Sequence, residues 1–298
     1  MIALDSDRSL KANGVASTAR QPKPMGPALR GLEIEIFLRK RLHGGGGNER
    51  FFACARRSPG TSMSRLDDFL GVLVEYRAAS VFNPWAEWDR EHDVDRSAPG
   101  IRLENLRRYL EGRIARAKVV LVAEAPGYQG CKFSGIAMTC ERQLMADPDP
   151  LFGGPYFDGP KRRTSRIATK PAGMIEPTAT IVWNAMLDSG FEGREWVNWN
   201  VFAWHPVGTR GSLSNRTPTS EEVLDGVPAL HLFLSVFEGL PIAAVGKTSE
   251  RALEAIGVET LASLRHPARG GATEFRQGIA LALTSDARDQ KRLGLLAD

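Results

Sequence analysis

Four polar side chains that can take part in bond cleavage stand at the ends of three short apolar runs in this sequence. Glu124 follows the first run, Asn200 lies in the second with His205 just after it, and His266 follows the last. Carboxyl ends of parallel strands share one edge of a sheet, so we expect a carboxylate, an amide and an imidazole around one crevice. Such a set suits a site that binds and cleaves something planar and polar.

Four apolar segments are predicted to be the strands that position these side chains. Residues 119–122 are apolar and mostly β-branched without alternation, which is typical of a strand buried on both faces of a parallel sheet. Pro126 and Gly127 then allow a sharp turn at the carboxyl end. The other predicted strands are residues 196–203, 242–246 and 261–264.

Helices are predicted between these strands from apolar residues at helical spacing. Thr219 and Glu222 have the spacing of a capping box, which marks the start of one of them. Strand and helix alternate, and this predicts an α/β fold: a three-layer α/β/α sandwich around a central four-stranded, mostly parallel sheet. We expect one domain over residues 61–298, preceded by a flexible extension over residues 1–60. The predicted helices cover residues 64–74, 103–114, 178–189, 219–237 and 248–256.

Composition argues against a membrane protein and against a disulfide scaffold. The 298 residues hold 39 Lys and Arg against 35 Asp and Glu, and no apolar run is long enough to cross a bilayer. Cys54, Cys131 and Cys140 are odd in number and have no paired spacing, so we expect neither a disulfide framework nor a four-thiolate metal site. We therefore expect a cytoplasmic protein that carries no metal and no cofactor.

Five ordered motifs carry a resemblance to a known family. The sequence resembles the uracil-DNA glycosylase superfamily, most closely its iron–sulfur bacterial branches, over roughly residues 100–285. The resemblance implies a DNA repair enzyme that flips uracil out of DNA and hydrolyses its N-glycosidic bond, leaving an abasic site. The motifs are AEAPG (123–127), NVFAWHP (200–206), NRTPTSEE (215–222), AAVGKTSERAL (243–253) and RHPA (265–268).

The same resemblance implies roles for individual residues. Glu124 falls in the water-activating motif, and Asn200 corresponds to the residue that hydrogen-bonds the uracil edge. His266 begins the loop that contacts uracil O2, and Ala125 and Tyr128 are expected beside the base.

The aromatic ring that stacks on uracil in this family is assigned to Phe133. Tyr128, Phe152 and Tyr156 remain alternatives for that ring. The family's best-known branch has a tyrosine directly after the motif's proline, where this chain has Gly127.

The iron–sulfur branches carry cluster cysteines where this chain has Trp204 and, approximately, Asp225 or Gly226. We therefore expect no iron–sulfur cluster.

Arginine-rich stretches are the expected contacts to DNA phosphates. The predicted partner is uracil-containing DNA, single- or double-stranded, bound by a monomer without any membrane. Three alternatives stay open: a non-catalytic reader of uracil-containing or damaged DNA, a glycosylase for another deaminated base, and an enzyme acting on free nucleosides. The residues expected to bind DNA are Arg162, Arg163, Arg166, Arg265 and Arg269.

Overall fold

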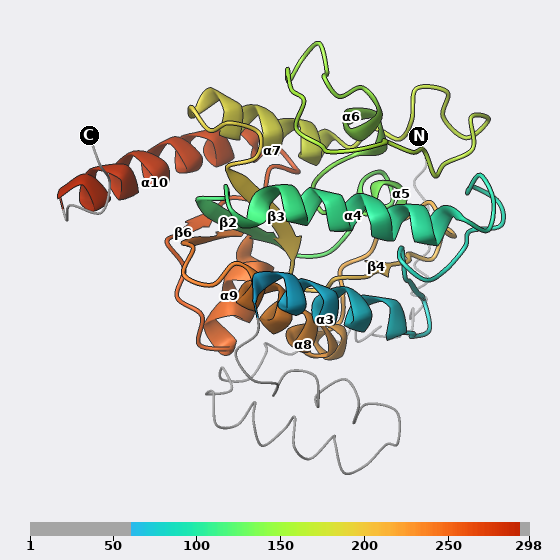
Figure 1. Cartoon of the computed structure of the whole chain (residues 1–298). Helices are drawn as coiled ribbons and strands as arrows, with labels where there is room; N and C mark the ends of the chain where they lie inside the picture. Colours follow the sequence, from blue (N-terminus) through green and yellow to red (C-terminus); the bar gives the residue numbers. More distant parts are fainter. Residues whose placement is uncertain (1–60, 293–298) are drawn as a thin grey trace, which may run out of the picture.

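A four-stranded parallel sheet lies at the centre of the computed structural model, which describes residues 61–292 and the side chains of residues 61–282. The strands follow the order β3-β2-β5-β6 and helices flank them, which confirms the predicted three-layer fold (Figure 1). The predicted extension over residues 1–60 lies outside the described residues. The strands are β2 (Val119–Ala123), β3 (Trp196–Asn200), β5 (Ile242–Val245) and β6 (Ala262–Leu264).

The register of the sheet brings the strand ends to one level. Ala123, the last residue of β2, pairs with Asn200, the last residue of β3. On the other side of the sheet, Val245 at the end of β5 pairs with Leu264 at the end of β6. Residues that follow these strands therefore gather at one edge.

Helices cover both faces of the sheet and one of its edges (Figure 1). On one face lie α3 (Ser62–Glu75), α8 (Ser220–Val236) and α9 (Lys247–Ala255); on the other lie α7 (Pro177–Asp188) and α10 (Ala272–Arg292). Helix α4 (Ala98–Ile114) covers the open edge of β3, where the Tyr109 hydroxyl accepts from the backbone N–H of Asn198 and Arg113 donates to the carbonyl of Trp196. No helix in the described part of the chain is long and apolar enough to cross a membrane.

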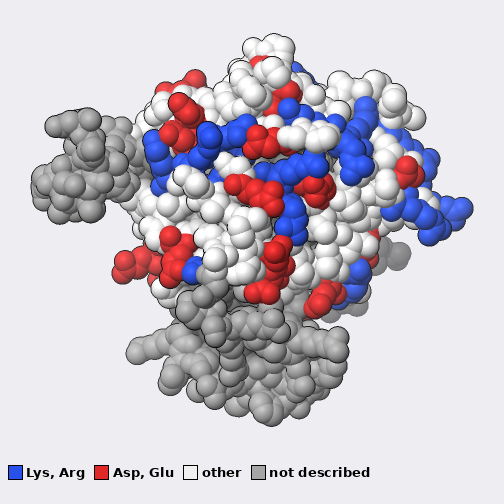
Figure 2. Space-filling view, viewed as in Figure 1, with Lys and Arg blue, Asp and Glu red and all other residues white. Residues whose placement is uncertain are grey.

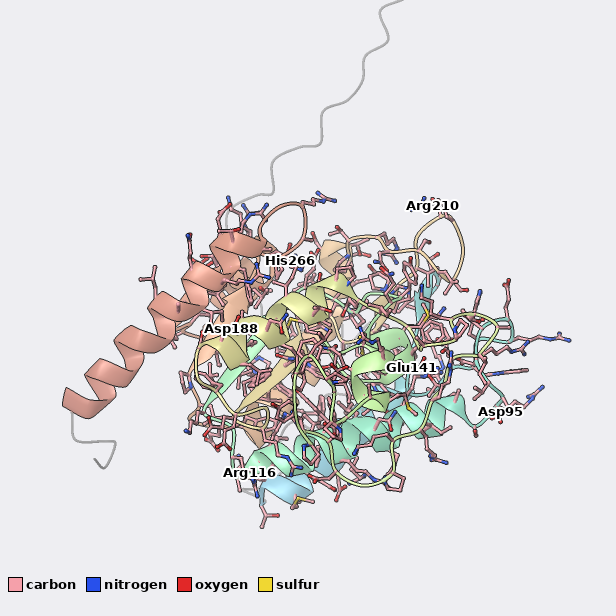
Figure 3. All side chains as sticks on the ribbon, turned by 90° about the horizontal axis from the view of Figure 1, so that it is seen from above. Asp95, Arg116, Glu141, Asp188, Arg210 and His266 are labelled. Carbon is pink, nitrogen blue, oxygen red and sulfur yellow. The ribbon has the colours of Figure 1, made fainter. Side chains whose placement is uncertain are left out.

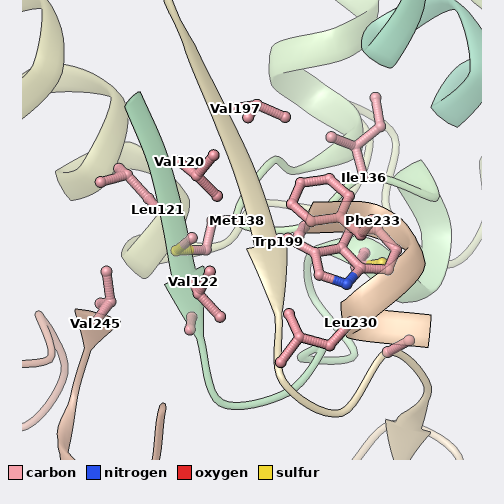
Figure 4. Packing of buried hydrophobic residues seen from close by; sticks show 14 of the residues in the cluster. Val120, Leu121, Val122, Ile136, Met138, Val197, Trp199, Leu230, Phe233 and Val245 are labelled. Carbon is pink, nitrogen blue, oxygen red and sulfur yellow. The ribbon is translucent and has the colours of Figure 1, made fainter. Parts of the chain in front are cut away.

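Side chains of β3 tie the sheet to the helices on both faces. Trp199 stacks on Phe233 of α8 with ring centroids 4.9 Å apart (Figure 4). It also meets Phe69 of α3 edge-on. Trp196 points to the opposite face and packs against Trp183 of α7. These rings are almost completely buried, so β3 is fixed on both faces by large apolar contacts.

Several elements were not predicted from the sequence. The loop-rich stretch over residues 128–177 contains two short helices, α5 (Cys131–Ser134) and α6 (Glu141–Met145). Strands β1 (Val81–Phe82) and β4 (His205–Pro206) form a small antiparallel pair, and α10 was not predicted at all. The predicted capping box of α8 is confirmed, because Thr219 Oγ1 accepts from the Glu222 amide and the Glu222 carboxylate accepts from the Thr219 amide.

Candidate active site

A cavity of about 430 Å³ opens at the carboxyl edge of the sheet. Its wall includes residues 123–127 after β2, Asn200 at the end of β3, and His266 beyond β6. Arg265 and Arg269 also line it. In Figure 3, His266 lies on the opposite side of the molecule from Arg116, which precedes β2, as the common strand direction requires. The structure thus brings together Glu124, Ala125, Asn200 and His266, as the sequence predicted.

Glu124 presents a partly buried carboxyl group to this cavity. Its Oε1 is buried and has no hydrogen-bond partner among the described residues. Burial raises the pKa of Glu124, while the Thr248 hydroxyl at the start of α9 and the charge of Arg269 act in the opposite direction. Oε1 of Glu124 is therefore free to accept a hydrogen bond from water. The carboxyl group can also balance a nearby positive charge.

Asn200 is placed directly by the sheet, because it is the last residue of β3. Its residue is only 2% exposed, yet it lines the cavity, so the accessible part of its side chain belongs to the site. Asn198, two residues earlier on the same face of β3, is fully buried, and both polar atoms of its amide lack partners among the described residues. Asn198 does not line the cavity.

The hydrogen bonding of His266 fixes the position of its ring proton. The backbone N–H of Ala268 donates to Nδ1 at 3.1 Å, so the neutral ring carries its proton on Nε2. Burial lowers the pKa of His266, and the charges of Arg265 and Arg269 lower it further. His266 is therefore a neutral hydrogen-bond donor at neutral pH.

Gly246, at the end of β5, allows His266 to lie close to the sheet. It has φ of 92°, and a Cβ atom at this position would be 3.2 Å from Cβ of His266. A larger residue here would be strained by its backbone conformation and would crowd the histidine.

Glu176 is the second acidic residue that lines the cavity, besides Glu124, and it was not predicted from the sequence. It precedes α7, about fifty residues after β2 in the chain, and it lines the cavity beside Gly127. Its Oε2 is buried without a hydrogen-bond partner among the described residues, and burial raises the pKa of Glu176 to about 7. No sequence motif marked this residue, since it lies in a long loop that only the folded chain brings to the sheet edge.

The residues expected beside the base are only partly brought into the cavity. Phe133 is completely buried in α5 and does not line the cavity, nor do Tyr128, Phe152 and Tyr156. Met138 lines the cavity instead, and it has a left-handed backbone conformation with φ of 45°. Among the described residues that line the cavity, His266 has the only ring other than proline, and Met138 has the largest apolar side chain.

Asn215, in the motif NRTPTSEE, lines the cavity from the opposite loop and fixes its entrance. Its side-chain oxygen accepts from the backbone N–H of Tyr128 at 2.9 Å. The loop that leads to it is anchored by Lys132, whose ammonium group donates to the Ser212 carbonyl and to the Asp89 carboxylate. Asn215 was not predicted from the sequence to be a site residue.

The five arginines expected on DNA fall into two groups, since only Arg265 and Arg269 line the cavity. Arg162 is exposed and borders a separate surface hollow with Arg96 and Arg108. On the face in Figure 2, Lys and Arg are interspersed with Asp and Glu, so this face has no continuous basic surface among its described residues.

Arg163 and Arg166 hold the long loop together. The guanidinium of Arg163 donates to the carbonyls of Ser165 at 2.6 Å, Pro171 at 2.7 Å and Arg166 at 3.0 Å. Arg166 itself donates to the Asp93 carbonyl at 2.8 Å. These donors are engaged by protein carbonyls, and phosphate contacts would compete with them.

Buried Glu141 organises the same loop from the other side (Figure 3). Its carboxylate accepts from the backbone N–H groups of Thr164 at 2.7 Å, Ser165 at 2.8 Å and Met174 at 3.3 Å. Glu141 thus fixes the segment that leads to Glu176.

Potential metal ligands do not gather in the part of the chain with described side chains. Over residues 61–282, no three His, Cys, Asp or Glu side chains lie close enough to hold a metal ion. Cys131 and Cys140 are buried free thiols, and burial raises the pKa of each.

Comparisons with known proteins give a likeness in fold. No family model matches the sequence, and no curated protein matches it. Among solved structures, the crystal structure of wild-type SMUG2 from Pedobacter heparinus is similar, with a TM-score of 0.50 and 12% sequence identity. The match covers 76% of this chain and 98% of that chain. The likeness shows that this chain shares the fold of SMUG2, a DNA glycosylase-like fold.

Proposed function

We propose that this protein is a DNA glycosylase that hydrolyses the N-glycosidic bond of uracil in DNA and leaves an abasic site. The observation that carries the proposal is the cavity at the carboxyl edge of the sheet, whose wall contains Glu124, Asn200 and His266. The glycosylase-like fold supports the same conclusion. The three residues come from three different strand ends, and each supplies a different group that base excision requires.

Asn200 reads the flipped base. Uracil presents an acceptor at O4 and a donor at N3–H, and an amide side chain offers the complementary donor and acceptor. Extruding a nucleotide from a duplex costs a few kcal/mol, and hydrogen bonds to the base edge offset part of that cost. Burial of Asn200 strengthens these bonds, since the amide competes little with water.

Glu124 and His266 stabilise the charges that form as the bond breaks. The C1′–N1 bond breaks with its electron pair leaving on the base, so the sugar becomes cationic and the base anionic. A water oxygen then bonds to C1′ and releases a proton, which gives the abasic sugar and free uracil after the base is protonated. Glu124 orients that water or balances the sugar's charge, and the Nε2–H of His266 donates to the oxyanion at O2.

Arg265 and Arg269 contact the phosphates that flank the extruded nucleotide. They stand at the cavity wall next to His266 and are exposed, so their charges are available to an anionic ligand. Their positive charge also keeps His266 neutral, which is the state in which Nε2 donates without carrying charge of its own.

An excision assay on a panel of oligonucleotides tests the proposed function. Single- and double-stranded substrates carry uracil, hypoxanthine, xanthine or mismatched thymine, and alkali converts abasic sites into strand breaks. The proposal predicts breaks with uracil, and their near disappearance in Glu124→Gln but not in Glu254→Gln, which alters an exposed glutamate on α9. A shifted band without strand breaks would instead identify a non-catalytic reader. Strand breaks that appear only with another base would show that this base, and not uracil, is the substrate.

A further inference from the structure

The carboxyl group of Glu176 occupies space next to two glycines of the loop after β2. A Cβ atom on Gly127 would lie 2.8 Å from its Oε1, and a Cβ atom on Gly130 would collide with its Oε2. Neither glycine has the positive φ that would itself demand glycine. The missing side chains at positions 127 and 130 therefore leave room for this carboxyl group.

The backbone of Glu176 is held in place on the helix side. Glu176 is extended, with φ of −112° and ψ of 117°, as expected for a residue before a proline, and Pro177 begins α7. Its carbonyl accepts from the backbone N–H of Thr180 at 3.2 Å and from the Thr180 hydroxyl at 3.3 Å. The side chain thus starts from a fixed point and reaches across to Gly127.

One oxygen of the carboxyl group has no partner among the described residues, although Glu176 lines the cavity. Its Oε2 has no hydrogen bond, and no neighbouring charge offsets its burial. Buried polar groups are normally paired, so an unpaired carboxyl oxygen at a cavity wall indicates that water or ligand completes its contacts.

The proposed function leaves one edge of the base without an assigned neighbour. In the proposed function, Asn200 forms hydrogen bonds with O4 and N3–H, and His266 donates a hydrogen bond to O2. Glu124 lies beside the bond from N1 to the sugar. C6 is bonded to N1 on the side away from C2 and O2, and C5 is bonded to C6. In this orientation of the base, C5 and C6 face the part of the cavity wall that lies beside Glu124 and away from His266. Gly127 follows Glu124 by three residues, and Glu176 lies against Gly127 in the lining of the same cavity, so we assign this wall to them.

We propose that Glu176 selects against bases that carry a methyl group at C5, and this inference rests on the proposed function. A methyl group would press on the carboxyl group and displace its water without offering a hydrogen bond. Covering a polar group without pairing it is costly, whereas the C5–H of uracil leaves space for water. The substrate class is therefore pyrimidines without an apolar C5 substituent, with uracil accepted and thymine rejected.

The experiment compares single-turnover excision of uracil and of thymine, each opposite guanine in the same duplex. These bases differ by one methyl group, and the ratio of the two rates is taken within one preparation, so a partly unfolded variant does not distort it. Glu176→Ala should raise the thymine-to-uracil ratio at least about tenfold. Glu176→Gln, which keeps size and polarity, should stay near the wild-type ratio.

A second variant tests the geometry directly. Gly127→Ala in the Glu176→Ala background puts a methyl group 2.8 Å from the position that Oε1 occupied, and it should restore part of the discrimination. Gly71→Ala, at a helical position with open space around it, is the matched glycine control and should leave the ratio unchanged in either background. Glu176→Ser provides a second small side chain if Glu176→Ala does not fold.

The outcomes separate the inference from the proposed function. Uracil excision by the wild type together with an unchanged ratio in Glu176→Ala or Glu176→Ser would overturn the inference and leave the proposed function standing. A wild type that excises no uracil would overturn the proposed function, and the inference with it.

Discussion

The imidazole of His205 lies 2.9 Å from the carbonyl oxygen of Pro126 through Nδ1. A carbonyl only accepts, so Nδ1 carries the proton in this hydrogen bond. His205 follows β3 and Pro126 follows β2, so the hydrogen bond ties together the two strand exits that carry Asn200 and Glu124. His205 is fully buried and does not line the cavity, which makes it a positioning residue for the site.

His205 should make stability fall in mild acid. Burial lowers the pKa of His205 to about 4, whereas its ordinary value is 6.5. Between these values the unfolded chain binds a proton that the folded chain does not, so this contribution to stability is fully present above pH 6.5 and is lost as pH falls toward 4. The variant His205→Asn can still donate a hydrogen bond to the carbonyl of Pro126, but its side chain does not titrate. We therefore expect its free energy of unfolding to depend less on pH between about 4 and 6.5.

Denaturant unfolding at several pH values from about 4 to about 8 measures this difference. His205→Ala, which lacks the donor, should be less stable than His205→Asn at every pH. If the free energy of unfolding changes equally with pH in the wild type and in His205→Asn, His205 is not the group responsible for the loss of stability in acid.

Met138 is expected to pack against the face of the bound base. A thioether next to an aromatic ring contributes about 0.3–1.5 kcal/mol, so Met138→Ala should lower kcat/KM for uracil roughly twofold to tenfold. Met145→Ala removes the same atoms from an exposed position on α6 outside the cavity and serves as the control. Equal kcat/KM for Met138→Ala and wild type would remove Met138 from the base-binding surface.

The two groups of arginines should differ in the salt dependence of DNA binding. Replacing Arg265 or Arg269 with alanine should make the slope of log K against log salt shallower by about 0.9 for each phosphate that the variant no longer neutralises. Arg163→Ala should leave the slope unchanged and lower thermal stability, because this side chain donates to carbonyls of its own loop. Binding titrations at several salt concentrations decide this, and a shallower slope in Arg163→Ala alone would reverse the assignment.

Asn200→Asp should change which base is preferred. A carboxylate accepts from the N4 amino group of cytosine but cannot donate to uracil O4, so uracil excision should fall and cytosine excision should rise relative to it. Asn184→Asp on α7, outside the cavity, is the matched control. Single-turnover rates on both bases measure the change, and an unaltered uracil rate would mean that Asn200 does not read the base.

The strands and the convergence of Glu124, Asn200 and His266 could be predicted because they depend on local patterns. A short apolar run bounded by turn residues identifies a buried strand, and parallel strands must end at one edge. The small pair of β1 and β4 was missed because two residues are too few to show alternation. Helix α10 was also missed, although Phe275 and Ile279 on it are buried at helical spacing.

The rest of the site depends on contacts between distant segments. Glu176 and Met138 reach the cavity through long loops that buried Glu141 and the Lys132–Asp89 ion pair hold, and single-sequence periodicity carries no information on such placement. Phe133 was expected beside uracil, but it lies on the short helix α5 and its side chain is completely buried in the protein interior.

The most direct test of the account is the single-turnover rate of uracil excision by His266→Ala. Removing a pre-placed donor to a developing oxyanion costs about 2.7–4 kcal/mol, so the rate should fall roughly 10² to 10³-fold. DNA binding should stay within a few fold, and Glu124→Gln combined with His266→Ala should lose less than the sum of the single losses if the two act as a unit. A His266→Ala protein that excises uracil at nearly the wild-type rate would contradict the account.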